Sequence, residues 1–192
     1  MKALRRAGCI GISSGVETGS QKLLDSMNKG STAQHEKLAL ARARKAHIPT
    51  FVNLLLGFVG EEDITLKETE DFVEQAAPQT LRVNPVVAWK GTEFVQAAFD
   101  NRWTDGHVDW KEELKGGYRL SSYPFYPNIE EARQKIMRVL RYNPKWWITS
   151  ANMLFRNPAL FLPTLGVYAR ELQRKMLRPQ ESEYGPKGLN GL

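Results

Sequence analysis

Cysteine is almost absent from this chain, because Cys9 is the only one in 192 residues. A single thiol excludes an internal disulfide framework and agrees with a reducing compartment. It also excludes a metal or iron–sulfur site that takes several thiolates from this chain alone. We interpret Cys9, which stands in an apolar stretch, as a small buried hydrophobic residue.

Long apolar runs are also lacking. The longest, residues 159–169, is much shorter than the ~20 residues of a spanning helix and contains Pro163. The first twelve residues are basic but have no apolar segment of the length that a signal peptide needs. We therefore expect a soluble, cytoplasmic chain, and contact with a membrane surface stays open as an addition.

Acidic residues are scarce in one segment only. Residues 1–128 hold 16 Lys and Arg against 16 Asp and Glu, whereas residues 129–178 hold 10 against 3. The net charge of +6 therefore belongs to the C-terminal segment. The front portion is not a general nucleic-acid surface, and we rank nucleic acid last among the partners.

What the chain does contain is an alternation of strand and helix patterns. Capping boxes at Ser31 with Gln34 and at Thr65 with Glu68 indicate two helix starts. Such alternation predicts an α/β fold with a parallel sheet or barrel, and its sites at the carboxyl ends of the strands. The expected strands are residues 9–13, 51–58 and 81–89, and the expected helices are residues 20–28, 31–47, 66–77 and 92–101.

Two details refine the expected sheet. The segment 51–58 is mostly aliphatic and uncharged, which is typical of a strand covered by helices on both faces. Pro85 inside the third strand indicates an edge, a bulge or a strand end. The expected ligand loops are residues 14–20, 57–63 and 86–93.

Three segments of the sequence carry a resemblance to a known family: residues 8–30, GCIGISSGVETGSQKLLDSMNKG, residues 48–62 and residues 80–95. In order, they resemble the fourth-strand region, the fifth strand with its "GxPGE" turn, and the sixth strand of the radical S-adenosylmethionine (radical SAM) superfamily. The resemblance is greatest to the subclass that often carries an N-terminal cobalamin-binding domain. The resemblance implies that the chain is the C-terminal half of the catalytic domain, a partial parallel (β/α) barrel of about three βα units.

The resemblance also implies where S-adenosylmethionine would bind. Ser13 and Glu17 would contact its nucleoside or amino acid portion, and Asn84 could reach the same ligand. Gly57 and Gly60 would let the backbone approach it. From the residues alone, Glu17 is equally a solvated loop acid, Ser13 a buried strand serine, and the glycines a means of turning the chain.

The chain departs from the family at the 4Fe–4S cluster, where the family's reaction begins. It has no C-x3-C-x2-C loop, so a 4Fe–4S cluster would not be ligated here, and the family's strands one to three are missing. We therefore expect a fragment or split product that is inactive alone and is completed by the missing N-terminal half or a partner chain. Glu61 would cap a helix or order its loop, and whether the intact enzyme uses cobalamin is left open.

The predicted domains are residues 1–103 as the partial barrel, 104–128 as an irregular connector, 129–178 as a basic, aromatic helical extension and 179–192 as a disordered tail. Trp146, Trp147, Phe155 and Phe161 lie in the extension. They fit a helical layer packed on the barrel, a peripheral membrane contact or, last, nucleic-acid stacking. The alternative function is thus a non-catalytic interaction or membrane-peripheral subunit.

The three histidines, His35, His47 and His107, lie on different predicted elements. None has a neighbour at the spacing of metal ligands, so surface or capping roles are expected, with no metal site.

Overall fold

The computed structural model describes residues 1–103, 117–119 and 128–156. The chain divides into two compact units, residues 1–151 and residues 152–192, and the account below concerns the first unit. The expected tail, the part of the expected extension from residue 157 on, with Phe161, and most of the expected connector lie outside the described residues.

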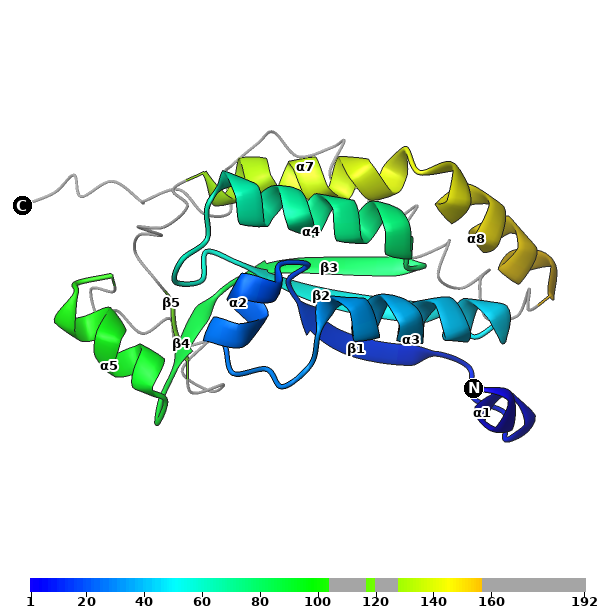
Figure 1. Cartoon of the computed structure of the whole chain (residues 1–192), viewed down its shortest axis with the longest axis horizontal. Helices are drawn as coiled ribbons and strands as arrows, with labels where there is room; N and C mark the ends of the chain where they lie inside the picture. The colour runs from blue at the N-terminus through cyan, green and yellow to red at the C-terminus, as the bar shows by residue number, and fades with distance from the viewer. Residues whose placement is uncertain (104–116, 120–127, 157–192) are drawn as a thin grey trace, which may run out of the picture. The chain divides into compact units, whose positions relative to one another are not determined.

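Three parallel strands form the central sheet in the order β1-β2-β3 (Figure 1). They are β1 (Ile12–Glu17), β2 (Thr50–Leu56) and β3 (Thr80–Pro85). The predicted α/β class with a parallel sheet is confirmed. The first strand is longer than predicted and lies later in the sequence, because the ladder from Ile12 opposite Thr50 continues to Glu17 opposite Leu54. Residues 14–17 are therefore strand and not loop.

Seven helices are described, and each expected helix from the front of the chain has a counterpart. In chain order they are α1 (Lys2–Arg6), α2 (Gln21–Ser26), α3 (Ala33–Lys45), α4 (Asp63–Ala76), α5 (Glu93–Asp100), α7 (Ile129–Arg141) and α8 (Pro144–Arg156). None of them is long and apolar enough to cross a membrane.

Two helix starts differ from the predicted capping boxes. The N-cap of α3 is Thr32 and not Ser31, and its hydroxyl accepts a hydrogen bond from the His35 N–H at 3.1 Å. The N-cap of α4 is Glu62, whose N–H donates to Thr65 Oγ1 at 2.9 Å. The box at Thr65 with Glu68 is therefore wrong by one turn, because Thr65 is the third residue of the helix and not its cap.

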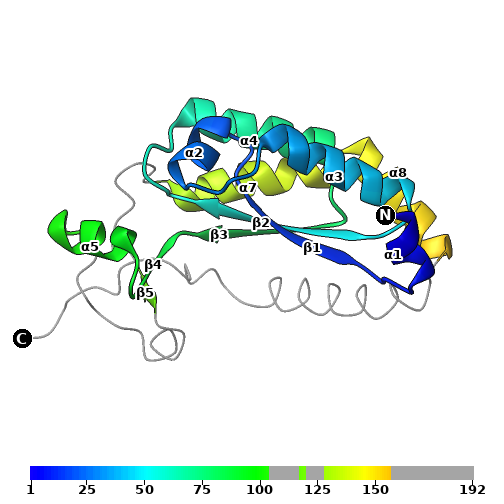
Figure 2. The same ribbon diagram turned by 60° about the horizontal axis from the view of Figure 1, so that its bottom comes forward.

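The hydrophobic core lies on one face of the sheet. Leu54 and Val83 point into it from β2 and β3, and Phe72 and Ile136 meet them from α4 and α7. Figure 2 shows α3, α4 and α7 together on this side of the sheet. Helix α7, the front of the basic extension, is thus packed on the sheet. Of the aromatic residues that follow it, Trp146 packs against this core, whereas Trp147 and Phe155 are exposed.

The other face of the sheet is not covered by the described helices. Phe51 in β2 is 40% exposed, and Arg82 and Asn84 in β3 are exposed. The prediction that helices bury β2 on both faces is therefore wrong for the described part of the molecule. The prediction rested on the mostly aliphatic sequence of β2. In the structure, Asn53 and the half-buried Leu55 occupy its open face.

The third predicted strand is interrupted at Pro85, which is the last residue of β3. Pro85 thus marks a strand end, one of its three expected roles. The chain continues as β4 (Val87–Trp89), which pairs in antiparallel fashion with β5 (Gly117–Arg119) inside the expected connector. Val86 and Ala88 form a small second hydrophobic core with Ala98 of α5.

Candidate functional site

The carboxyl ends of the three strands meet at one edge of the sheet, as they must in a parallel sheet. Glu17 ends β1, Gly57 follows β2, and Asn84 is the next-to-last residue of β3. Because Glu17 lies opposite Leu54 and Asn84 lies opposite Leu55, the two polar residues stand about one register position apart across β2. This edge and the adjoining open face form the candidate site.

Glu17 has a backbone conformation that few residues other than glycine adopt. Its φ is 69°, and the pairing of β1 with β2 shifts between Gly15 and Glu17, so that Val16 forms a bulge. A bulge re-aims the side chains that follow it. Val16 therefore points into the core, while Glu17 remains on the open side with Gly15.

The Glu17 carboxylate is fixed by two neighbours. Its Oε1 lies 3.0 Å from the ammonium of Lys29, and its side chain is only 20% exposed. A Cβ at Gly15 would lie 2.4 Å from the same oxygen. Because Gly15 has no side chain, it leaves room for the Glu17 carboxylate. This packing is reason enough for a glycine at position 15, and no bound ligand is needed to explain it.

Lys29 is a residue that the sequence analysis missed. It follows α2 in a turn where Asn28 and Gly30 both have positive φ, 51° and 71°. Its N–H donates to the Leu24 carbonyl at 3.0 Å, which fixes the turn to the end of α2. The signal was present in the quoted motif "MNKG", but the spacing of twelve residues from Glu17 is not a helical or strand period and indicated no contact.

The loop after Glu17 is anchored to α4. Thr18 Oγ1 lies 2.9 Å from Thr69 Oγ1, and the Gly19 N–H donates to Thr69 Oγ1 at 3.0 Å. A Cβ at Gly19 would lie 2.5 Å from Phe72 Cβ and 2.7 Å from the Glu68 carbonyl oxygen. Gly19 is thus required for close packing of the loop on the helix, an explanation that the sequence did not offer.

The turn after β2 is held by a buried acid. Glu61 is 4% exposed and its carboxylate accepts a hydrogen bond from the Gly57 N–H. Burial raises the pKa of Glu61 to about 7, although the Gly57 hydrogen bond acts in the opposite direction. Of the two roles expected for Glu61, ordering the loop is the one observed, because Glu62 is the cap of α4.

The glycines of this turn are needed for its shape. Gly57 and Gly60 have φ values of 83° and 86°, in the region that disfavours other residues. The Gly57 N–H is already bonded within the turn, so a ligand would meet other groups there. Binding by either glycine stays a prediction.

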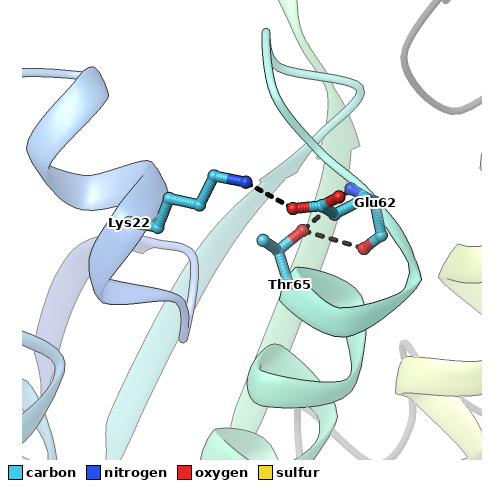
Figure 3. A network of polar contacts seen from close by, with 3 residues as sticks. All are labelled: Lys22, Glu62 and Thr65. Carbon is cyan, nitrogen blue, oxygen red and sulfur yellow. Dashed lines mark hydrogen bonds and ion pairs between the residues drawn. The ribbon is translucent and has the colours of Figure 1, made fainter.

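An ion pair joins the turn that follows β2 to helix α2, which comes after β1 in the chain. Lys22 of α2 forms an ion pair with Glu62, which also begins α4 through Thr65, as Figure 3 shows. Both charged side chains are more than half exposed, so the pair orients the two segments and adds little stability.

Ser13 lies apart from the other predicted site residues. It is exposed on the open face near the start of β1, four residues before Glu17 and thus roughly 10–13 Å away along the strand. Its Oγ accepts a hydrogen bond from Asn53 Nδ2 at 3.5 Å. The structure therefore brings Glu17, Gly57 and Asn84 to one edge, with Gly60 in the turn beyond, but not Ser13.

Metal ligands are not gathered in the described part of the chain, where no group of three or more His, Cys, Asp or Glu side chains could hold an ion. Cys9 is half-buried and its Sγ donates to the Gly11 carbonyl at 3.3 Å, so its expected full burial is wrong. The residues present do not fit an iron–sulfur cluster, which takes several thiolates.

Comparison with known proteins gives one informative similarity, and no family model matches the chain. The chain is 31% identical over 136 residues to the anaerobic magnesium-protoporphyrin IX monomethyl ester cyclase of Cereibacter sphaeroides. The match covers 71% of this chain but 17% of the cyclase, so this chain spans less than a fifth of that protein's length. The chain is distantly similar to this cyclase.

Proposed function

We propose that this chain supplies the C-terminal half of a radical SAM catalytic domain and holds S-adenosylmethionine at the carboxyl edge of its sheet. One observation carries the proposal. The three segments that resemble the family end at the same edge, next to a sheet face that the described helices leave open. In open α/β sheets, ligands bind outside the carboxyl ends of the strands.

The similarity to the cyclase supports the same class of chemistry. Its name describes ring formation under anaerobic conditions. Ring formation without dioxygen needs another way to break C–H bonds, and a 5′-deoxyadenosyl radical provides one. Because this chain corresponds to a small part of the cyclase, the substrate and the reaction of the whole protein do not carry over with the similarity.

The charged pair at the edge suits the amino acid end of S-adenosylmethionine. The carboxylate of Glu17 is complementary to the α-ammonium group, and the ammonium of Lys29 is complementary to the α-carboxylate. Asn84 offers an amide donor and acceptor to the ribose hydroxyls. When bound, S-adenosylmethionine would supply the adenosyl group from which the radical is made.

The remaining parts of the enzyme would come from elsewhere. The proposed cluster needs three thiolates, and this chain has one cysteine. In the described part of the chain β1 pairs with β2 only, so its outer edge is available to a further strand of the N-terminal half or of a partner chain. Whether cobalamin takes part depends on that other portion.

Binding of S-adenosylmethionine to the chain tests the proposal. Equilibrium dialysis with radiolabelled S-adenosylmethionine would compare the wild-type chain with Glu17→Gln, and with Glu68→Gln as a control for an exposed acid on α4. We expect saturable binding that weakens about tenfold or more in Glu17→Gln and is unchanged in Glu68→Gln, since a charge-assisted hydrogen bond is lost. Equal uptake by the wild type and Glu17→Gln would overturn the assignment of Glu17.

A further inference from the structure

The opposite edge of the sheet, where the strands begin, is basic. Helix α1 and the end of α3 enclose a surface cavity of about 390 Å³ there, which is lined by Lys2, Arg5, Arg6, Lys45, Ala46 and His47. No carboxylate lines this cavity. The carboxyl-terminal ends of α1 and α3 thus present like charges to the solvent side by side.

The start of α8 lies at the same edge. Trp146 Nε1 donates to the carbonyl of Gln79, the residue before β3, at 3.1 Å. Gln79 Oε1 in turn accepts from the N–H of Thr50, the first residue of β2, at 2.9 Å. Gln79 therefore ties α8 to the beginnings of two strands, and Figure 2 shows α1 and the end of α3 on this side as well.

The stretches of chain at this edge that enter or leave the strands contain no acid. Residues 1–12, 42–51, 77–82 and 141–151 have no Asp or Glu. Arg141 and Lys145 are exposed beside the α7–α8 corner, in addition to the cations of the cavity. Asp71 and Glu74 of α4 border a different groove, with Lys67 and Tyr142. The Glu74 carbonyl accepts a hydrogen bond from Asn143 Nδ2 at 2.6 Å, at the α7–α8 corner.

Large apolar side chains are exposed among these cations. Trp147 is 59% and Ile148 61% exposed at the start of α8, and Leu4 and Ile10 are 45% and 65% exposed on and after α1. Trp147 Nε1 donates to the Arg141 carbonyl at 2.8 Å, so the exposed ring has its polar group satisfied. Trp146, in contrast, packs against the main core.

We infer that this basal face, formed by Lys2, Leu4, Arg6, Ile10, Lys45, Lys145, Trp147 and Ile148, docks on an anionic lipid bilayer. Cations attract anionic headgroups, while Trp and aliphatic side chains enter the interface between headgroups and acyl chains. Nucleic acid would use the cations and stack on Trp147, but it offers no favourable contact to the exposed aliphatic residues. The carboxyl edge of the sheet then faces away from the bilayer, whatever it binds.

Vesicle co-sedimentation tests this inference. The chain would be spun with vesicles of phosphatidylcholine alone and of phosphatidylcholine with phosphatidylglycerol, as the wild type, Arg6→Glu/Lys45→Glu and Trp147→Ser/Ile148→Ser. The matched controls are Lys90→Glu and Ile64→Ser, two exposed positions near the opposite edge. Circular dichroism of each variant would show that it is folded.

We expect the wild type to sediment with the anionic vesicles only. Each lost cation should weaken partitioning about fivefold, and the double apolar variant should weaken it by at least as much. The controls should sediment like the wild type. Equal sedimentation with both kinds of vesicle, or equal losses in the controls, would overturn the inference. Binding to a single-stranded oligonucleotide that is lost in Arg6→Glu/Lys45→Glu, together with no sedimentation of the wild type with anionic vesicles, would assign the face to nucleic acid instead.

Discussion

The carboxylate of Glu17 and the ammonium of Lys29 lie 3.0 Å apart at the carboxyl edge of the sheet, over the bare backbone of Gly15. Three local features produce this contact: the bulge at Val16, the positive φ of Glu17 and the turn that carries Lys29. A non-glycine residue with positive φ costs about 1–3 kcal/mol and persists where its surroundings require it. A strained acid paired at a strand end is thus a reason to look for a ligand there.

Replacing Lys29 by methionine separates structure from binding. A partly exposed ion pair contributes about 0–1 kcal/mol, so Lys29→Met should change the urea midpoint little. Affinity for S-adenosylmethionine should fall about tenfold, because the proposed partner of its carboxylate is lost. Lys37→Met, on α3, is the control and should leave both quantities unchanged. If Lys29→Met unfolds the chain, the pair is structural and our assignment is wrong.

Glu61 makes the stability depend on pH. Its folded pKa of about 7 lies above the value of 4.5 of an unperturbed Glu, so the folded chain holds this proton more tightly. The contribution is therefore fully present below pH 4.5 and is lost as pH rises through about 7, by on the order of 3 kcal/mol. Urea unfolding at several pH values would measure the slope.

The matched variant is Glu61→Gln, which keeps an acceptor for the Gly57 N–H but does not ionise. It should remove the part of the pH dependence that belongs to Glu61 and exceed the wild type in stability at pH 8. A wild type and a Glu61→Gln variant with parallel pH profiles would contradict the raised pKa.

Gly19→Ala should destabilise the fold. The added Cβ would meet the Glu68 carbonyl and the Thr69 Cα, each at 2.7 Å, and backbone atoms cannot move aside easily. We expect a loss of about 1–3 kcal/mol in the free energy of unfolding. Gly11→Ala is the control, because its Cβ would meet only the ring of the partly exposed Phe51, which can turn away. Equal losses in the two variants would argue against the tight packing of the loop on α4.

Substitutions of the two adjacent tryptophans should change the free energy of unfolding by unequal amounts. Trp146 packs against the main core and bonds to the Gln79 carbonyl, so Trp146→Ala should cost about 3 kcal/mol in unfolding free energy. Trp147 is 59% exposed, and Trp147→Ala should cost less than about 1 kcal/mol. Chemical denaturation of both variants measures this, and the reverse order would refute the described packing of α8.

The class of the fold was readable from the sequence because each strand and helix has its own local period. The sequence also marked Pro85 as an irregularity of the third strand, and a strand end was one of its three expected roles, since proline cannot donate a ladder hydrogen bond. It failed at the exact start of a helix. The hydroxyl that caps α3 is Thr32 and not Ser31, because two adjacent hydroxyl residues offer similar caps and a helix boundary is uncertain by one or two residues from sequence.

The site was predictable in part for the same reason. Glu17 and Asn84 lie at the carboxyl ends of strands and Gly57 directly follows one, so a parallel sheet places all three at one edge. Lys29 could not be found, because a turn with two positive φ values carries it back to Glu17. The packing role of Gly19 was equally hidden, since it depends on how closely α4 approaches.

The central claim is that the edge formed by Glu17, Gly57 and Asn84 holds S-adenosylmethionine. Its most direct test is the change in the backbone amide resonances of the ¹⁵N-labelled chain when S-adenosylmethionine is added. The account predicts saturable shifts for residues 15–19, Lys29, Gly57 and Asn84, with none for residues 2–8 at the basal face. Shifts confined to other residues, or no shifts at saturating ligand, would contradict it.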